Sequence, residues 1–358
     1  MASATRLPLK SILFTSTVAI GIGASRVNLR SHAISFFTGS GRNSRILAAV
    51  ILLANLKNVP FAWHYRVWGA ILRHCLFSRP RIPPALAPST LFLPVITSSY
   101  SPLNECDYNL HKSNSTYFSD LDVSRSHLVC ALLQPGIERL QHNVREKLVL
   151  DKEGRPVKGR WLIMLGGVMC SFKREIGMYE GYEMWSRLLC WDRKWIYVVT
   201  HFVKKGAVKP SAYILDDGSW FGGKGYKKVE GKGGKEVDEK AIFASAISKY
   251  VVKLGRLTVH PEVFLQASDM LPPKPGGWAS MANSGESTPE TLDVETETTG
   301  VEAVEAEATV EWDWRRVEAE NKKGLAIAEH LGALDALHHE FTGSQAPALG
   351  RYRDFVSM

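Results

Sequence analysis

The sequence has 358 residues and a formal net charge of +8, with 44 Lys and Arg against 36 Asp and Glu. This length fits two average domains or one domain with long extensions, and we favour the second because charge is unevenly spread along the chain. A basic protein can bind nucleic acid, but here the cations are scattered among apolar segments and no nucleic-acid motif occurs. We therefore predict no nucleic-acid partner.

Residues 1–82 form a basic head that contains eleven Lys and Arg, and no acidic residue precedes Glu105. Two apolar runs, 12–22 and 46–56, each have eleven residues, about half of the roughly 20 that a membrane-spanning helix needs. Trp63, Tyr65 and Trp68 follow the second run and suit a membrane interface. The head is predicted to be a membrane-anchor or targeting region, so that its removal would release an active protein.

Three interpretations of this head stay open. It is a single membrane anchor, an acid-free mitochondrial transit segment, or a helix packed on the globular domain. The first two agree best with the missing acidic residues. The expected location is therefore a membrane, either of the endoplasmic reticulum or of the mitochondrion.

A globular domain is predicted over residues 83–275. It opens with a Pro-rich stretch and a strand-like run at 91–97, followed by an informative segment. Asp107 is followed by His111, Asn114 and Tyr117 at spacings of four, three and three residues. A carboxylate beside the start of a helix can attack a carbonyl or activate water, while free backbone N–H groups polarise the carbonyl oxygen. This arrangement suits cleavage of an activated acyl group.

The rest of the domain reads as one helix followed by strands. Apolar residues with helical spacing predict an amphipathic helix from Tyr117 to the Pro135-Gly136 pair. Alternation predicts a strand over 168–176, and two aromatic-rich runs, 182–191 and 195–203, predict a hairpin. Further strands are expected at 208–215 and 250–259. Residues 216–240 form a Gly- and Lys-rich stretch without the spacing of a phosphate-binding loop, and we predict an exposed insertion.

The end of the chain changes composition twice. Residues 286–313 hold ten acidic residues and no Lys or Arg, so 276–311 is predicted to be an acidic disordered linker. Residues 312–358 contain an apolar stripe that predicts a C-terminal helix over 312–341, docked on the domain or on a partner, and a tail.

The five cysteines include no closely spaced pair and predict neither a zinc site nor a disulfide framework. Cys106, Cys170 and Cys190 fall in apolar strand-like runs, where buried reduced thiols are common. The catalytic domain is therefore expected in a reducing compartment.

The pattern Asp-x-x-x-His-x-x-Asn-x-x-Tyr resembles the signature of hotdog-fold thioesterases of the 4-hydroxybenzoyl-CoA type, which usually read Asp-x-x-Gly-His-x-Asn-Asn-x-x-Tyr. Longer stretches, at 105–122, 166–174, 191–195 and 253–256, are similar to the thioesterase-superfamily-member-6 group and its fungal relatives. The resemblance covers roughly residues 90–270. Two positions depart from the signature: Leu110 replaces the glycine and Ser113 replaces the first asparagine.

The resemblance implies an α+β hotdog fold, in which a curved antiparallel sheet wraps around one long helix. It also implies hydrolysis of an acyl thioester, carried by coenzyme A or by an acyl carrier protein, without a metal or other cofactor. A polyketide-derived acyl chain and ordinary lipid metabolism are both open. Hotdog domains commonly pair, so a homodimer that completes each active site is expected.

The resemblance makes Asp107 the nucleophile or general base. His111 would contribute its backbone N–H or its imidazole, and Asn114 would position the loop or a water. These residues also have structural interpretations: Asp107 and Asn114 as turn or cap residues, and His111 as a turn histidine. Tyr117 is expected to pack, or to line the acyl pocket. Phosphates of coenzyme A would contact the cations at the ends of strands, for which the alternative is a solvated rim: Lys173, Arg174, Arg193 and Lys194.

Two rival functions remain. The substitutions at Leu110 and Ser113 favour a non-catalytic, membrane-tethered hotdog scaffold, whereas the retained Asp107 argues against it. A hotdog dehydratase would act on hydroxyacyl thioesters, but that chemistry normally pairs a His with an acid across the dimer in a different motif. Analysis of the product would separate a free acid from an enoyl thioester.

Overall fold

The computed structural model describes residues 28–78, 82, 86–215, 227–228, 239–279, 312–332 and 334. The chain forms two compact units, the smaller comprising 1–62 with 102–104 and the larger 63–101 with 105–358. The predicted apolar run at 12–22, most of the insertion and linker residues 280–311 lie outside the described residues.

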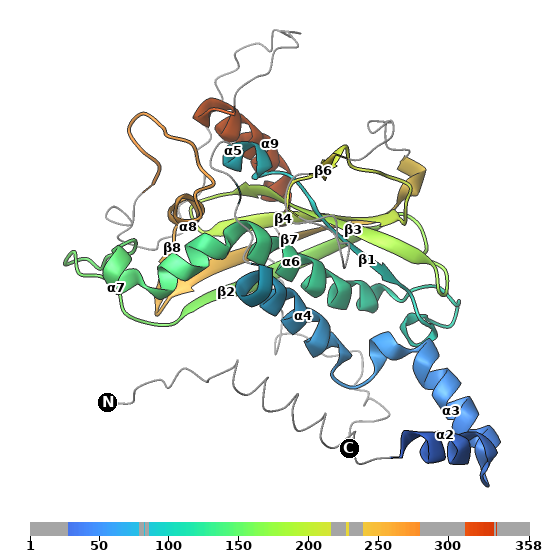
Figure 1. Ribbon diagram of the computed structural model, residues 1–358. Helices are drawn as coiled ribbons and strands as arrows, with labels where there is room; N and C mark the ends of the chain where they lie inside the picture. The colour runs from blue at the N-terminus through green and yellow to red at the C-terminus, as the bar shows by residue number, and fades with distance from the viewer. Residues whose placement is uncertain are drawn as a thin grey trace, which may run out of the picture. The chain divides into compact units, whose positions relative to one another are not determined.

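One antiparallel sheet lies at the centre of the larger unit (Figure 1). Its strands run in the order β1-β3-β4-β7-β2, and β8 also pairs with β7. The bounds are β1 Val95–Tyr100, β2 Trp161–Phe172, β3 Gly181–Trp191, β4 Trp195–Lys204, β7 Ile242–Leu254 and β8 Leu257–Val259. In Figure 1 the sheet curls around one long helix, α6 (Asn114–Gln141). The predicted α+β hotdog architecture and the predicted β3–β4 hairpin are therefore confirmed.

The helix α6 is longer than predicted because it continues through Pro135 to Gln141. Proline inside a helix removes one backbone hydrogen bond, and glycine is a weak helix former, so the pair predicted an end. Tertiary packing outweighs both effects. A Cβ at Gly136 would lie 2.3 Å from Ser268 Oγ, so the missing side chain lets α6 pack closely against the segment that follows α8 (Pro261–Ala267).

Two strands also differ from their predicted bounds. Strand β2 begins at Trp161, not at 168, because a bulge between Leu165 and Gly167 breaks the two-residue alternation on which the prediction depended. A Cβ on Gly166 would lie 2.2 Å from the Trp195 ring, so glycine lets that ring cover the strand. The predicted strand at 250–259 is the end of β7, a turn at Gly255 with φ of +60°, and β8.

The first predicted strand, at 91–97, is shifted. Strand β1 starts at Val95, and Leu91 is fully buried in the core just after the short helix α5 (Ala87–Thr90). The predicted strand at 208–215 is reduced to β5 (Ala212–Tyr213), which pairs with β6 (Lys227–Lys228). The remaining short elements are η3 Leu103–Glu105, α7 Asn143–Glu146 and η4 Glu239–Ala241.

The two faces of the sheet are covered by different helices. Leu188, Ile196 and Val252 belong to the core on the α6 side. On the other face, Cys190 and Tyr197 pack against the C-terminal helix α9 (Trp314–Gly332). The predicted C-terminal helix is confirmed over this range, and it docks on the domain itself.

A side-chain amide fixes the position of α9. Asn321 Oδ1 accepts from the Trp191 N–H at 2.7 Å, and Asn321 Nδ2 donates to the Trp191 carbonyl at 3.1 Å. A Cβ on Gly324 would lie 2.4 Å from the Leu189 carbonyl oxygen. Glycine is therefore required where α9 crosses β3.

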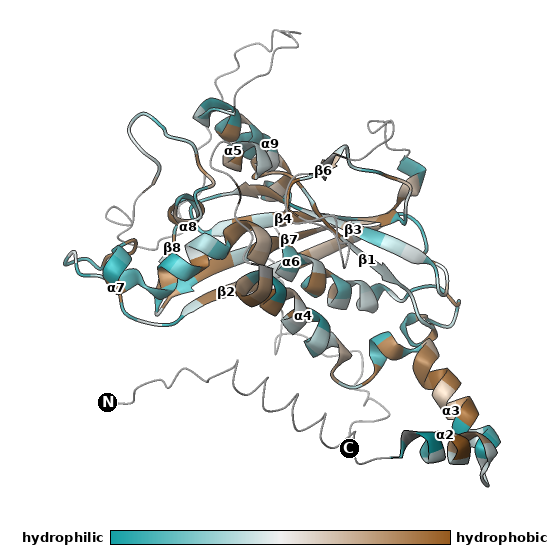
Figure 2. Ribbon diagram, in the orientation of Figure 1, coloured by the Kyte–Doolittle hydropathy of each residue, from teal (hydrophilic) through white to brown (hydrophobic). Residues whose placement is uncertain are grey.

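The described part of the smaller unit is helical. It contains α2 (Leu29–Thr38), α3 (Arg42–Ala54) and the short η1 (Leu56–Asn58). No residue of α3 is buried, and Figure 2 shows this helix as largely hydrophobic. Its exposed apolar side chains are Leu47, Val50, Ile51, Leu52 and Leu53. Among the helices that the structure describes, none has both the length and the apolar character needed to cross a bilayer.

The second half of the basic head belongs to the larger unit. It contains most of α4 (Ala62–Leu72) and the π-helix η2 (Arg73–Ser78), which contacts α6. Ala70 is fully buried, and His74 Nε2 lies 3.0 Å from His127 Nδ1 of α6. The predicted boundary at residue 82 therefore lies beyond a segment that packs on the globular domain.

Candidate active site

The segment that carries the Asp-His-Asn-Tyr spacing folds into a small hairpin, residues 105–113, which we call the motif hairpin. Cys106 and Lys112 form an antiparallel bridge between its arms. Nearer the tip, the backbone N–H of Asp107 donates to the carbonyl of His111 at 2.9 Å. The hairpin leads directly into α6, so it holds Asp107 beside the start of that helix.

The tip of the hairpin is a turn in which Leu110 has φ of +62°. The Leu110 N–H donates to the Asp107 carbonyl at 3.0 Å. A left-handed third loop residue is common in three-residue hairpin connections, and glycine takes it without steric cost. Leucine costs roughly 1 kcal/mol there. The chain therefore keeps, with Leu110, a backbone conformation for which glycine is the usual residue.

The Asp107 carboxylate is half-buried, and its Oδ1 accepts from the Asn109 N–H at 2.9 Å. Its structural role as a turn residue is therefore real. Within the described part of the chain, no Lys, Arg or His forms an ion pair with this carboxylate. Forming the turn and reacting with a substrate are compatible, because one oxygen can hold the turn while the other reacts.

The His111 side chain points away from Asp107. Its Nε2 lies 3.2 Å from Glu175 Oε2, and both side chains are substantially exposed. Its backbone bridges to Gly177, which precedes β3. The part of His111 that faces Asp107 is therefore its backbone. Asn114 is exposed and is the first residue of α6.

The N-terminus of α6 lacks a side-chain cap. Ser113 is the N-cap residue, and its hydroxyl makes no capping hydrogen bond. The Thr116 N–H donates to the Ser113 carbonyl at 3.0 Å. The first N–H groups of a helix have no partner within the helix, and together with the helix dipole they attract an anion or a developing oxyanion. The half-buried carboxylate and these donors are thus supplied by adjacent parts of one chain segment.

Tyr117 is a packing residue. It is fully buried, its ring meets those of Phe172 and Phe202 at centroid distances of 5.0 and 4.8 Å, and burial raises its pKa far above the ordinary value. Its hydroxyl therefore stays protonated. Among the residues described, we find no group of three or more His, Cys, Asp or Glu side chains arranged to hold a metal ion.

The four predicted phosphate-binding cations are not brought together. Lys173 and Arg174 follow β2, are exposed, and both donate backbone N–H groups to the Phe243 carbonyl. Arg193 and Lys194 are exposed in the β3–β4 turn, at the far end of β3 from Gly177. Because β3 has 11 residues, about 33 Å separates its two ends. Only the first pair lies on the same side as the motif hairpin.

A buried ionic network that was not predicted from the sequence lies beneath the hairpin. Lys112 Nζ lies 2.5 Å from Glu105 Oε2 and 2.9 Å from Asp120 Oδ2. Asp120 also accepts from Arg66 of α4, at 2.6 Å, and from the Tyr182 hydroxyl. Lys112 and Asp120 are completely buried. Local spacing gave no sign of it, because Arg66 and Asp120 are 54 positions apart.

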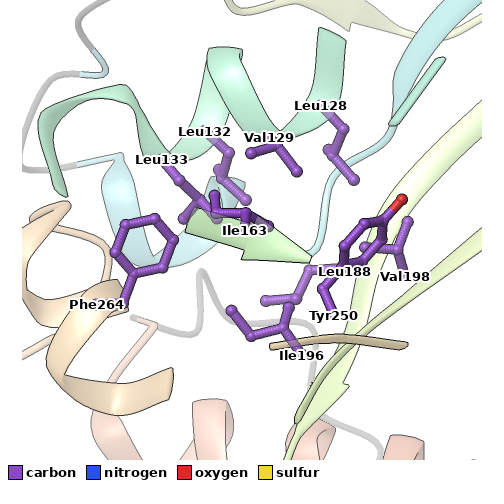
Figure 3. Close-up of a pocket in the computed structure, with 10 residues that line it drawn as sticks. All are labelled: Leu128, Val129, Leu132, Leu133, Ile163, Leu188, Ile196, Val198, Tyr250 and Phe264. Atoms are coloured by element: carbon purple, nitrogen blue, oxygen red, sulfur yellow. The ribbon is translucent and has the colours of Figure 1, made fainter. Parts of the chain in front are cut away.

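An apolar pocket lies between α6 and the sheet (Figure 3). It is lined mainly by aliphatic side chains, including Leu128, Leu132 and Val198. Among the lining residues, Tyr250 carries a hydroxyl group. Burial raises the pKa of Tyr250 to about 12. The residues of the motif hairpin do not line this pocket, and the buried Leu121 of α6 lies between the two along the helix.

Comparison with known proteins identifies relatives across most of the chain. A family model described as "Thioesterase-like superfamily" matches residues 101–230. Thioesterase poxG of Penicillium oxalicum is 36% identical over 309 residues, which cover 86% of this chain and 89% of poxG. The probable thioesterase atnL of Emericella nidulans is 34% identical over 85% of this chain and 90% of its own length.

Among solved structures, the YbaW probable thioesterase from Escherichia coli matches with a TM-score of 0.30 and 10% identity. The match covers 49% of this chain and 96% of YbaW. The sequence relatives therefore identify the family, whereas the structural match adds no detail of the site.

Proposed function

The chain belongs to the thioesterase-like superfamily and is a thioester hydrolase, and we propose that the motif hairpin is its active site. The substrate would be an acyl group carried by coenzyme A or by an acyl carrier protein, and the product a free acid. The observation that carries this proposal is the position of the half-buried Asp107 carboxylate. Asp107 flanks the turn of a hairpin that continues into the N-terminus of α6, where no side chain caps the helix.

The simplest reaction uses Asp107 as a general base. Its carboxylate takes a proton from water while the water oxygen bonds to the thioester carbonyl carbon, and the carbonyl oxygen becomes an oxyanion. The tetrahedral intermediate then collapses, the C–S bond breaks, and the proton on Asp107 passes to the departing thiolate. Direct attack by Asp107 would instead form an anhydride that water cleaves. Both routes return Asp107 as a carboxylate.

Backbone donors would stabilise the oxyanion. The N–H groups near His111 and those of the first turn of α6 are the candidates that adjoin Asp107 in the chain. The direction of the His111 imidazole, toward Glu175, supports a role for its backbone in preference to its side chain. Lys173 and Arg174 would contact a phosphate of the carrier, and their position after β2, at the end of the sheet near the hairpin, supports this role.

A homodimer would complete the site. Strand β2 is an edge strand, hydrogen-bonded only to β7 in the described sheet. It exposes five large apolar side chains: Leu162, Met164, Leu165, Met169 and Phe172. Long apolar edge strands are normally paired or protected, and a second copy of this chain can pair along such an edge. Phe172 also contacts Tyr117, so a partner on β2 would lie next to the hairpin.

The surface near the hairpin is apolar as well. Tyr108 is 93% exposed, and Leu110, Met178 and Tyr179 are 42–56% exposed. The bridge between His111 and Gly177 brings the turn with Tyr108 and Leu110 close to the turn with Met178 and Tyr179. An apolar rim of this kind supports coverage of the hairpin by the partner protomer or by the acyl chain.

A membrane is the proposed location of the enzyme. Helix α3 exposes apolar side chains around its circumference, and it carries Arg42 and Arg45 at its start. A helix of 13 residues is too short to span a bilayer, but it can lie within the interface while its basic residues contact anionic lipid. Leu110 and Ser113 depart from the family signature and favoured a non-catalytic scaffold, whereas the thioesterase relatives support the enzyme.

The decisive experiment is thiol release from acyl-CoA substrates of short, medium and long chain, with acyl carrier protein thioesters as a second panel. Release of a free acid in step with the thiol would support the proposal. An enoyl thioester product would instead indicate a dehydratase. If neither panel releases thiol, the proposed substrate class is wrong.

A further inference from the structure

We infer that Lys112 is the positioning residue of the motif hairpin, an inference that rests on the proposed function of Asp107. Its ammonium group joins the two arms through Glu105, at 2.5 Å, and ties them to α6 through Asp120, at 2.9 Å. Asp107 lies between the two residues that this ion pair connects. Lys112 therefore fixes the geometry of the Asp107 carboxylate relative to the start of α6 without touching the substrate.

The backbone supports the same role. The Lys112 N–H donates to the Ile176 carbonyl at 2.8 Å, which attaches the hairpin to the connection between β2 and β3. The Ser113 N–H donates to the Glu105 carbonyl at 2.7 Å and closes the base of the hairpin. Lys112 thus links the hairpin to the β2–β3 connection through its backbone and to α6 through its side chain.

Burial of this cation is costly. The Lys112 side chain is fully buried among Glu105, Asp120 and the rings of Tyr117 and Tyr182, 5.3 and 5.4 Å from its Nζ. An apolar side chain of similar size would avoid the desolvation of both ions, and such replacements often leave stability unchanged or increase it. A buried lysine in this place is better explained by the orientation that it imposes than by stability.

The network is balanced in charge. Among the described residues, two cations, Lys112 and Arg66, face two carboxylates, Glu105 and Asp120. Replacement of Lys112 alone removes the buried ammonium group from Glu105. Replacement of Lys112 and Glu105 together keeps the balance, because Arg66 still pairs with Asp120. The single variant loses both the charge balance and the link from the hairpin to α6, whereas the double variant loses only the link.

The experiment compares Lys112→Met with the double variant Lys112→Met/Glu105→Gln in the full chain. Lys274→Met is the matched control, since Lys274 pairs with Glu318 and lies over the Trp278 and Trp314 rings, remote from the hairpin. We expect kcat to fall about 100-fold in both Lys112 variants, the loss typical of a misplaced catalytic group. KM should change little, the double variant should regain thermal stability but not kcat, and the control should keep kcat.

Amide hydrogen exchange provides a readout that does not depend on activity. Residues 105–113 should lose protection in both Lys112 variants and keep it in Lys274→Met. The inference is overturned if hairpin exchange in the Lys112 variants equals that of the wild type, or if the double variant recovers kcat together with stability. Absence of thiol release from the wild type would refute the proposed function instead, and hydrogen exchange would still report on the hairpin.

Discussion

The backbone N–H of Asp107 donates to the carbonyl of His111 at 2.9 Å, so these two residues of the motif meet through their backbones. The His111 imidazole contacts the Glu175 carboxylate, and the Asp107 carboxylate accepts a hydrogen bond from the Asn109 N–H. If the motif hairpin is the active site, as we propose, the reaction depends on one carboxylate and on backbone groups. The Asp107 side chain is then expected to matter far more than the His111 side chain.

Asp107→Asn should lower kcat by about 10²- to 10⁴-fold, the usual contribution of a general base. Asparagine keeps the oxygen that accepts from Asn109, so the turn should survive. His111→Ala should retain most of the activity, because it removes only an exposed contact to Glu175. Steady-state thiol release measures both. Equal losses of kcat in the two variants would show that the His111 imidazole matters as much as the Asp107 carboxylate. That result would contradict a role for the His111 backbone alone.

Leu110→Gly should stabilise the protein by about 1 kcal/mol, because glycine adopts the left-handed conformation without strain. The observed φ is +62°. Thermal unfolding should shift upward by roughly 2–4 °C for a domain of this size. Tyr108→Gly is the matched control: it lies in the same turn, is exposed and has no positive φ. A lower melting temperature for Leu110→Gly than for Tyr108→Gly would contradict the claim that the backbone at Leu110 is strained.

The sequence was sufficient to predict the hotdog fold, the β3–β4 hairpin and the position of the motif before α6. It failed where tertiary contacts override local signals. The bulge at Gly166 hid the first half of β2, and packing of Gly136 against Ser268 carried α6 past Pro135. The ion pair of Arg66 with Asp120 had no local signal either, because it joins separate helices.

Charging the β2 edge should separate a dimer. Leu165→Lys/Met169→Lys places two ammonium groups on an exposed apolar strand, and two copies paired there would repel each other. We expect a monomer in light scattering, with loss of activity if the partner completes the site. Leu257→Lys on β8, also exposed but off this edge, is the control and should leave the oligomeric state unchanged. A dimer in the double variant would place the interface elsewhere.

Stability should fall as pH decreases from about 6.5 to about 4. Burial, with His74 and Arg73 nearby, lowers the pKa of His127 to about 4. The unfolded chain then binds a proton in this pH window that the folded chain does not, so acid favours unfolding. Burial lowers the pKa of His201 and His260 too, so their contributions have the same sign.

Urea unfolding of wild type and His127→Gln at pH 7, 5.5 and 4.5 tests this assignment. The variant should lose part of the acid sensitivity, with the remainder due to the other two histidines. His201→Gln is the comparison outside the contact between η2 and α6. If His127→Gln keeps the full pH dependence, protonation of His127 does not cause the loss of stability in acid.

Two truncations should separate membrane binding from catalysis. Removal of residues 1–62 takes away α3 and its exposed apolar side chains but leaves most of α4. This variant should no longer sediment with anionic phosphatidylcholine/phosphatidylserine vesicles and should keep its kcat. Removal of residues 1–82 also takes Arg66 and Ala70, so the buried Asp120 carboxylate loses its half-buried partner Arg66. Loss of one member of a buried ion pair costs about 3–5 kcal/mol.

The longer truncation should therefore be unstable and inactive, which replaces the expectation from sequence that all 82 residues are dispensable. Arg66→Met in the full chain isolates the ionic contribution and should lower the melting temperature. Arg45→Met is its control, since Arg45 donates to the Ser35 carbonyl and lies over the Phe36 ring, both within the smaller unit. Activity in the 1–82 truncation would show that α4 is not part of the catalytic core, and vesicle binding by the 1–62 truncation would exclude α3 as the lipid contact.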